Sequence, residues 1–122
     1  MTTPPLLLTV GANKRNLELL AQFLGKQGYQ TIAAATLEEF DQALNSSQEF
    51  SLALVDIGGF DRGIWDICER LRAKDIPLLV ISAKQSASID KESLTHGARG
   101  VLVKPLVIRE LLVLVRNLIE VS

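Results

Sequence analysis

The fold is decided by the stretch Leu52-Ala53-Leu54-Val55-Asp56. Its first four residues are an unbroken apolar run, which is typical of a strand buried on both faces of a parallel sheet. The run ends in the carboxylate of Asp56, and a loop containing Gly58 and Gly59 follows. In open α/β sheets, ligands bind in the crevice beyond the carboxyl ends of the strands. We therefore expect Asp56 to lie in the functional site.

Segments of strand and helix character alternate along the whole chain. The predicted strands span residues 6–10, 31–34, 52–56, 78–81 and 101–103, and the predicted helices span residues 14–27, 36–44, 64–72, 88–96 and 108–119. Five strand–helix units in strict alternation predict an α/β protein with parallel strands and helices on both faces of the sheet. The chain has no internal repeat, linker or low-complexity segment, so residues 1–122 are predicted to form one domain.

Capping residues and apolar stripes support the predicted helices. Asn13 is suited to cap the first helix, and Gly28 and Gly97 are suited to end the first and fourth helices in a left-handed conformation. The fourth helix is weak, since Ile89 and Leu94 are its sizeable apolar anchors. The stripes expected to face the core are Leu17, Leu20, Phe23 and Leu24 in the first helix and Ile108, Leu111, Leu112, Val115, Leu118 and Ile119 in the last.

Composition excludes several classes of protein. The net charge is −1, which argues against direct binding of nucleic acid through bulk charge. The single cysteine, Cys68, excludes an internal disulfide, and with one histidine, His96, it excludes a Cys/His metal cluster. The first residues lack the basic start and long apolar core of a signal peptide, and no apolar run approaches the ~20 residues of a membrane span. A cytoplasmic protein with no membrane contact is expected.

Polar side chains follow the predicted strands at their carboxyl ends. They are Asp56, Ser82 and Lys104, together with the segment Gly11-Ala12-Asn13. Because parallel strands end at one edge of a sheet, an acid, a hydroxyl and an amine are expected to converge there. A carboxylate can act as a nucleophile, and a hydroxyl and an ammonium can hold phosphoryl oxygens.

These segments resemble the receiver domain of bacterial two-component response regulators, over residues 6–119. The matching stretches are residues 52–56, 76–83 and 97–105, in the order and spacing of that family. The resemblance implies a flavodoxin-like (βα)5 fold with sheet order 2-1-3-4-5. It also implies that Asp56 is the phosphoacceptor, Ser82 the switch hydroxyl and Lys104 the partner of the phosphoryl oxygens. The Lys104-Pro105 peptide bond is expected to be cis.

The chain departs from the family after the first strand. Receivers normally carry two or three acids there, which hold Mg²⁺, whereas this chain has Gly11-Ala12-Asn13. Mg²⁺ requires near-octahedral oxygen ligands, so its site is expected to be weak or absent, with Asp56, Asn13 and Asp61 as the candidate ligands. Lys14 and Arg15 follow the vacant positions. One of them could stand in for the metal charge beside Asp56, although solvated side chains in the first helical turn are the favoured interpretation.

Other departures concern the switch. Val101 stands where the family usually has a Tyr or Phe ring, and Phe60 and Ile64 alter the loop and helix after Asp56. We interpret Trp65 as a packing or partly exposed residue, Cys68 as a core residue, and His96 as suited to the end of a helix.

The resemblance implies a signalling module in a phosphorelay rather than an enzyme. Its partners would be a histidine kinase or phosphotransfer protein and a downstream protein. Val113, Leu114 and Val101 make the surface of the fourth helix, last strand and last helix apolar, which favours a homodimer or partner contact there. The alternatives are a phosphorylation-independent pseudo-receiver that acts as a scaffold, and a small-molecule-binding module of flavodoxin-like fold.

Overall fold

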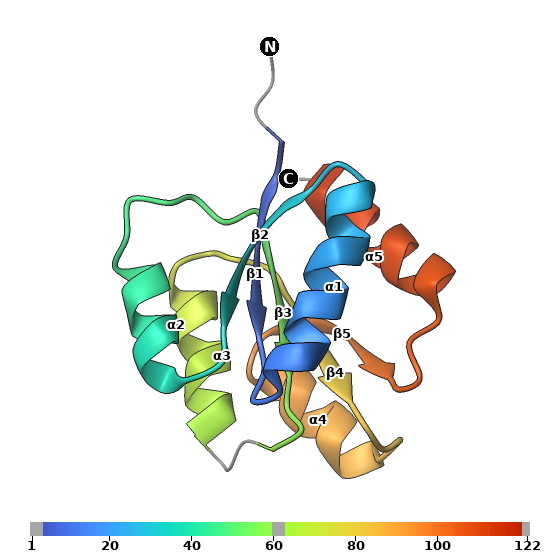
Figure 1. The fold of residues 1–122 in the computed structure, drawn as a ribbon. Helices are drawn as coiled ribbons and strands as arrows, with labels where there is room; N and C mark the ends of the chain where they lie inside the picture. The colour runs from blue at the N-terminus through green and yellow to red at the C-terminus, as the bar shows by residue number, and fades with distance from the viewer. Residues whose placement is uncertain (1–3, 60–62, 121–122) are drawn as a thin grey trace.

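The computed structural model describes residues 4–59 and 63–120, and its elements alternate between strand and helix (Figure 1). The strands are β1 (Leu6–Val10), β2 (Gln30–Ala34), β3 (Leu52–Asp56), β4 (Leu78–Ser82) and β5 (Ala98–Val103). The helices are α1 (Lys14–Lys26), α2 (Leu37–Leu44), α3 (Gly63–Ala73), α4 (Ala87–Thr95) and α5 (Ile108–Glu120). The predicted alternation of five strands and five helices is confirmed.

All the strand pairs are parallel, and the sheet has the order β2-β1-β3-β4-β5. Val10 at the end of β1 lies opposite both Ala34 and Val55, and Asp56 lies opposite Ile81. This register brings the carboxyl ends of the strands to one edge. The predicted fold class and strand order are therefore confirmed.

Two apolar cores lie on opposite faces of the sheet. Figure 1 shows α1 and α5 over one face and α2 and α3 over the other. On β3, Ala53 and Val55 belong to the core beneath α2 and α3, whereas Leu52 and Leu54 belong to the core beneath α1 and α5. Burial on both faces explains why this strand is apolar at every position up to Asp56.

Local signals in the sequence determine the helix ends. The Asn13 side chain accepts a hydrogen bond from the backbone N–H of Asn16 at 3.1 Å, which caps α1. Gly28 and Gly97 have φ angles of 91° and 98°, as expected for residues that end helices in the left-handed region. At Gly97, an added Cβ would also lie 2.9 Å from Cδ of Arg72, so this position favours glycine for two reasons.

Three predictions about the C-terminal third were wrong. β5 begins at Ala98 rather than Val101, because Ala98 pairs with Leu78 directly after Gly97 and the register then shifts before Val101. Leu94 is 58% exposed and does not anchor α4. Ile108 is also exposed, so the buried stripe of α5 starts at Leu111.

α4 buries a polar side chain, and a polar contact links its C-terminal end to α3. Ser93 is buried, and its hydroxyl donates to the carbonyl of Ile89, one turn earlier in the same helix, at 2.6 Å. The Arg72 guanidinium of α3 donates to the carbonyl of Thr95 at 3.3 Å. The helix therefore depends on few apolar contacts.

No helix within residues 4–59 and 63–120 has the length and apolar character that crossing a bilayer requires.

Candidate functional site

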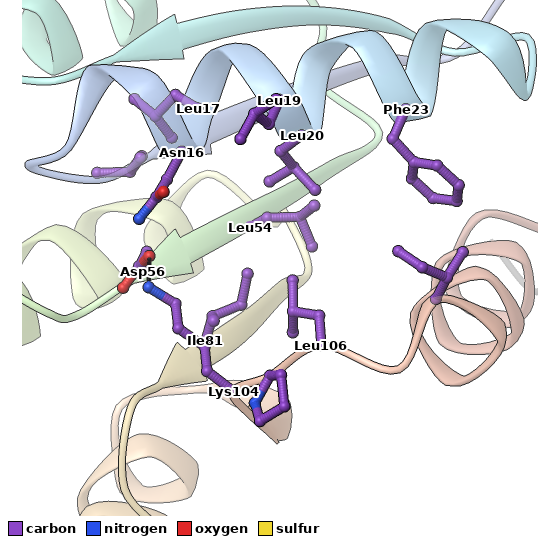
Figure 2. Close-up of a pocket in the computed structure, with 13 residues that line it drawn as sticks. Asn16, Leu17, Leu19, Leu20, Phe23, Leu54, Asp56, Ile81, Lys104 and Leu106 are labelled. Carbon is purple, nitrogen blue, oxygen red and sulfur yellow. Dashed lines mark ion pairs between the residues drawn. The ribbon is translucent and has the colours of Figure 1, made fainter.

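Asp56 and Lys104 meet at the carboxyl edge of the sheet. Asp56 ends β3, and Lys104 follows β5, where its backbone N–H donates to the carbonyl of Ser82 at 2.8 Å. The Lys104 ammonium Nζ lies 2.6 Å from Oδ2 of Asp56. Both side chains are labelled in Figure 2. The predicted convergence of the acid and the amine is confirmed.

The Asp56 carboxylate has a partner at each oxygen. Oδ2 pairs with Lys104, and Oδ1 accepts a hydrogen bond from the backbone N–H of Gly58 at 3.0 Å. The side chain of Asp56 is 13% exposed, whereas that of Lys104 is 32% exposed. A carboxylate this shielded requires such partners. Lys104 thus neutralises Asp56 and remains open to solvent.

Ser82 lies at the same edge, but its hydroxyl is engaged by the loop after β4. The hydroxyl donates to the carbonyl of Lys84 at 2.8 Å and accepts from the backbone N–H of Lys84 at 3.2 Å. The residue is 2% exposed. The sequence predicted its position at the strand end, but the direction of its hydroxyl depends on the loop conformation.

The segment after β1 approaches Asp56 closely. A Cβ added to Gly11 would lie 3.3 Å from Cβ of Asp56 and 3.2 Å from Cδ2 of Leu17, so a larger residue would press on the site. Ala12 is exposed, and its Cβ would lie 3.0 Å from a Cβ added to Gly59. Gly11 is therefore closely fitted against Asp56, whereas Ala12 is exposed and approaches the loop at Gly59.

The residues described at this edge do not fit a magnesium site. The cavity above Asp56 has a volume of about 420 Å³, and its described lining is Ala12, Asn13, Asn16, Asp56, Gly58, Gly59 and Lys104. Asp56 is the sole carboxylate in that lining, and both of its oxygens have partners. The side-chain oxygen of Asn13 is used to cap α1. Mg²⁺ prefers octahedral oxygens that include carboxylates. The third candidate, Asp61, lies outside the described residues, as does Phe60.

The basic residues of α1 do not neutralise Asp56. Lys14 and Arg15 are both exposed, and the Arg15 guanidinium lies 4.0 Å from the carboxylate of Glu18. The cation beside Asp56 is Lys104. The hypothesis that Lys14 or Arg15 replaces the metal charge is therefore wrong, and solvated side chains are the better description.

Asn16 also lies beside the site, and no motif in the sequence marks it. Figure 2 shows its amide directed toward the carboxylate of Asp56. It follows the cap Asn13 by three residues, so both lie on the first turn of α1. Helical spacing from Asn13 was the signal that could have identified it.

Val101, Trp65 and His96 pack against neighbouring side chains. Val101 is half-buried against the core beneath α2 and α3. Trp65 is half-buried and stacks on His96, with ring centroids 5.5 Å apart. The two ring nitrogens of His96 lie 3.1 Å from Glu69 and 3.3 Å from Glu92.

Cys68 is fully buried in the core beneath α2 and α3, as predicted. Burial, followed by the charge of Glu69, raises its pKa to about 12. The Lys104-Pro105 peptide bond is cis, also as predicted.

A parallel five-stranded sheet whose third strand ends in an acid, held by a lysine after the fifth, defines a receiver-type signalling domain. The chain belongs to the response regulator receiver domain family, which matches residues 7–116. That family functions in two-component signalling and is not a class of conventional enzymes.

Curated relatives support this assignment. The transcriptional regulatory protein HprR of Escherichia coli strain K12 is 33% identical over 113 residues, which cover 90% of this chain and 49% of the relative. The transcriptional regulatory protein PmrA of Pectobacterium parmentieri is 33% identical over 116 residues, which cover 93% of this chain and 52% of the relative. The chain spans about half the length of these curated relatives.

Solved structures have the same fold. A two-component response regulator from Clostridium difficile superposes with a TM-score of 0.86 at 22% identity, covering 95% of this chain and 96% of the other. A putative response regulator from Chloroflexus aurantiacus J-10-fl superposes with a TM-score of 0.83 at 28% identity, covering 96% and 98%.

Proposed function

We propose that residues 1–122 form one receiver domain of a phosphorelay, in which Asp56 is the phosphoacceptor or the remnant of one. The observation that carries this proposal is the ion pair between Lys104 and Asp56 at 2.6 Å, at the sheet edge where the family performs its chemistry. The proposal includes a cytoplasmic location and a signalling role rather than an enzymatic one.

In this proposal, an oxygen of Asp56 attacks the phosphorus of a phosphohistidine or an acyl phosphate, and the bond to the donor breaks. Lys104 would then exchange its contact with Asp56 for a phosphoryl oxygen. The Ser82 hydroxyl would have to leave its two hydrogen bonds to the backbone of Lys84 to serve as the switch hydroxyl.

We expect the metal dependence of this domain to differ from that of typical receivers. The donor set described around Asp56 supports weak or absent binding of Mg²⁺. A site would have to use Asp61 or the Asn13 oxygen that caps α1. The charge that a metal would neutralise is met in part by Lys104. We therefore expect phosphorylation to be slow, or to be lost.

Signalling would pass through protein contacts. The segments α4, β5 and α5, with the connection before α5, expose five aliphatic side chains: Leu94, Val103, Val107, Ile108 and Val113. This surface supports a homodimer or a downstream partner. The expected contributions of Val101 and Leu114 are smaller, since both pack partly against the two cores. The phosphodonor would be a histidine kinase or a phosphotransfer protein, with no direct contact to nucleic acid.

A second candidate function is a pseudo-receiver that acts as a scaffold without phosphorylation. Ala12 in place of an acid and Val101 in place of an aromatic ring favour this alternative. In such a protein, the ion pair between Asp56 and Lys104 would hold a single signalling state.

The deciding experiment is intact-mass spectrometry after incubation with acetyl phosphate, with and without Mg²⁺, on the natural chain and on Asp56→Asn. A phosphoryl adduct that disappears in Asp56→Asn supports the receiver, and dependence on Mg²⁺ would show that other ligands replace the missing acids. An unmodified mass, even at high Mg²⁺, would overturn phosphorylation by this route and leave the scaffold.

A further inference from the structure

A second cavity adjoins the one above Asp56. It has a volume of about 290 Å³ and lies between α1 and the connection from β5 to α5 (Figure 2). Its walls are apolar and include Leu19, Leu20 and Phe23 of α1, Leu54 of β3 and Leu106. Small-molecule sites are typically apolar hollows of ~300–1,000 Å³ with a few converging polar groups. This cavity is at the lower end of that range, so it would take a small ligand.

The polar groups of the cavity gather at one end. Asn16, Asp56 and Lys104 line both cavities, so the two hollows meet at the ion pair. Figure 2 shows the Asn16 amide and the Lys104 ammonium both directed toward Asp56. The side chains of Leu20, Leu54 and Leu106 lie farther along the cavity. A ligand that fits both parts has an apolar body and one polar head.

The charges at this end favour an anionic head. A lysine ammonium has three donors, and Lys104 uses one of them on Asp56 while remaining 32% exposed. Both oxygens of Asp56 already have partners, and its side chain is 13% exposed, so it is less available to a cation. The charged residues in the described lining of the two cavities are Asp56 and Lys104, so the partly exposed ammonium of Lys104 is the group that can attract a ligand.

We propose that this cavity binds a small amphiphilic carboxylate. Its hydrocarbon body lies among Leu20, Phe23 and Leu106, and its carboxylate accepts hydrogen bonds from Nζ of Lys104 and the amide of Asn16. The bound carboxylate competes with Asp56 for Lys104 and covers the acid. Ligand binding and phosphorylation at Asp56 therefore oppose one another. This inference goes beyond the proposed function, and the binding test below does not require phosphoryl transfer.

The test is a titration of the ¹⁵N-labelled chain with hexanoate, octanoate and decanoate, followed by amide chemical shifts in NMR. Saturable shifts are expected at Leu20, Phe23 and Leu106. Each buried methylene contributes about 0.8 kcal/mol, so two more methylenes should lower the Kd by roughly tenfold. Octan-1-ol, which has the same chain length without the charge, should bind more weakly than octanoate.

Two variants distinguish the contribution of the carboxylate head to binding from that of the hydrocarbon body. Lys104→Met should lower the affinity for octanoate by about tenfold, because one charge-assisted hydrogen bond is lost. The affinity for octan-1-ol should stay nearly unchanged. Leu19→Asp places a carboxylate at the rim of the cavity. It should also lower the affinity for octanoate, because like charges repel. Leu37→Asp on α2 is the matched control, because Leu37 is 54% exposed and Leu19 is 47% exposed.

Three results would overturn the proposal. One is the lack of saturable shifts with all three carboxylates in the millimolar range, which is the outcome expected if the cavity accepts only a side chain of a protein partner. Another is an equal loss of affinity for octanoate in Leu19→Asp and in Leu37→Asp. The third is a set of shifts spread over α2 and α3, which would indicate non-specific binding of the hydrocarbon chain.

Discussion

Lys104 and Asp56 form an ion pair at 2.6 Å in which the two partners are unequally shielded from water. The acid is 13% exposed, and the lysine is 32% exposed. Removing a partner from a shielded pair is costly chiefly because of the charge left behind. Replacing Lys104 and replacing Asp56 should therefore lower the free energy of unfolding by different amounts.

Lys104→Met should lower the free energy of unfolding at pH 7 by about 1–2 kcal/mol, below the cost of breaking a fully buried pair, since it leaves the Asp56 carboxylate without its cation. Asp56→Asn should cost less than about 1 kcal/mol, because the lysine left behind can be hydrated and the new amide oxygen can still accept from Gly58. Urea denaturation of both variants measures the difference.

The double variant supplies the control for this pair. Lys104→Met combined with Asp56→Asn should be more stable than Lys104→Met alone, since no unpaired carboxylate remains. Additive costs in the double-mutant cycle would contradict the assigned ion pair.

Restoring acids after β1 should create a metal site. Ala12→Asp with Asn13→Asp adds two carboxylates near Asp56, and aspartate caps α1 as well as asparagine does. Because Mg²⁺ prefers carboxylate oxygens, its affinity should rise at least ~10-fold, a gain of about 1.4 kcal/mol. Calorimetric titration with Mg²⁺ measures this, and the acetyl phosphate reaction should then become faster with the metal.

The matched control is Ala12→Asn, which has nearly the same size without the charge. It should bind Mg²⁺ no better than the natural chain. Equal gains from Ala12→Asn and from the acid pair would show that side-chain size, rather than charge, governs the site.

Cys68 should make stability depend on pH at the alkaline end. Burial, with a smaller effect of the Glu69 charge, raises its pKa from 9.0 to about 12 in the folded chain. Below pH 9 the thiol is protonated in both the folded and the unfolded chain. The contribution of Cys68 to the free energy of unfolding is therefore fully present there. Between pH 9 and 12 the unfolded chain binds fewer protons, so the free energy of unfolding should fall by up to ~1.4 kcal/mol per pH unit.

Comparison with Cys68→Ala isolates this effect from the lysines and the tyrosine that titrate in the same range. The variant should show a smaller loss of stability between pH 9 and 12 in urea denaturation. In the natural chain, Cys68 should react slowly with iodoacetamide at pH 8 and readily in urea. Parallel pH profiles for the two proteins would contradict the raised pKa.

Two leucines in neighbouring helices should differ strongly in importance. Leu111→Ala should destabilise the chain by about 2–5 kcal/mol, because Leu111 is fully buried in the core beneath α1 and α5. Leu94→Ala should change stability by less than about 0.5 kcal/mol, since that side chain lies mostly in solvent. Thermal or urea denaturation distinguishes the two, and equal losses would show that α4 is anchored by Leu94 after all.

Most of the fold could be predicted because its signals are local. The apolar run of β3 reflects burial on both faces, and Asn13 and Gly28 mark the ends of α1 through their own side-chain and backbone chemistry. The meeting of Asp56 with Lys104 followed from the rule that parallel strands end at one edge.

The features that could not be predicted depend on contacts between distant segments. Ala98 enters β5 by pairing with Leu78, although the residues around it have little strand character. Leu94 is exposed because α4 buries Ser93 instead. The hydroxyl of Ser82 is directed by the conformation of the loop at Lys84, which no periodicity in the sequence encodes.

The position of Ala12 has a consequence for how such a protein can evolve. The residue lies beyond the last pairs of β1 and outside both cores. An alanine codon becomes an aspartate or glutamate codon by a change of a single nucleotide, and Asn13 becomes aspartate equally easily. Lineages can therefore lose or regain the acids of this site in a few mutational steps, while the folding of the domain stays under separate selection.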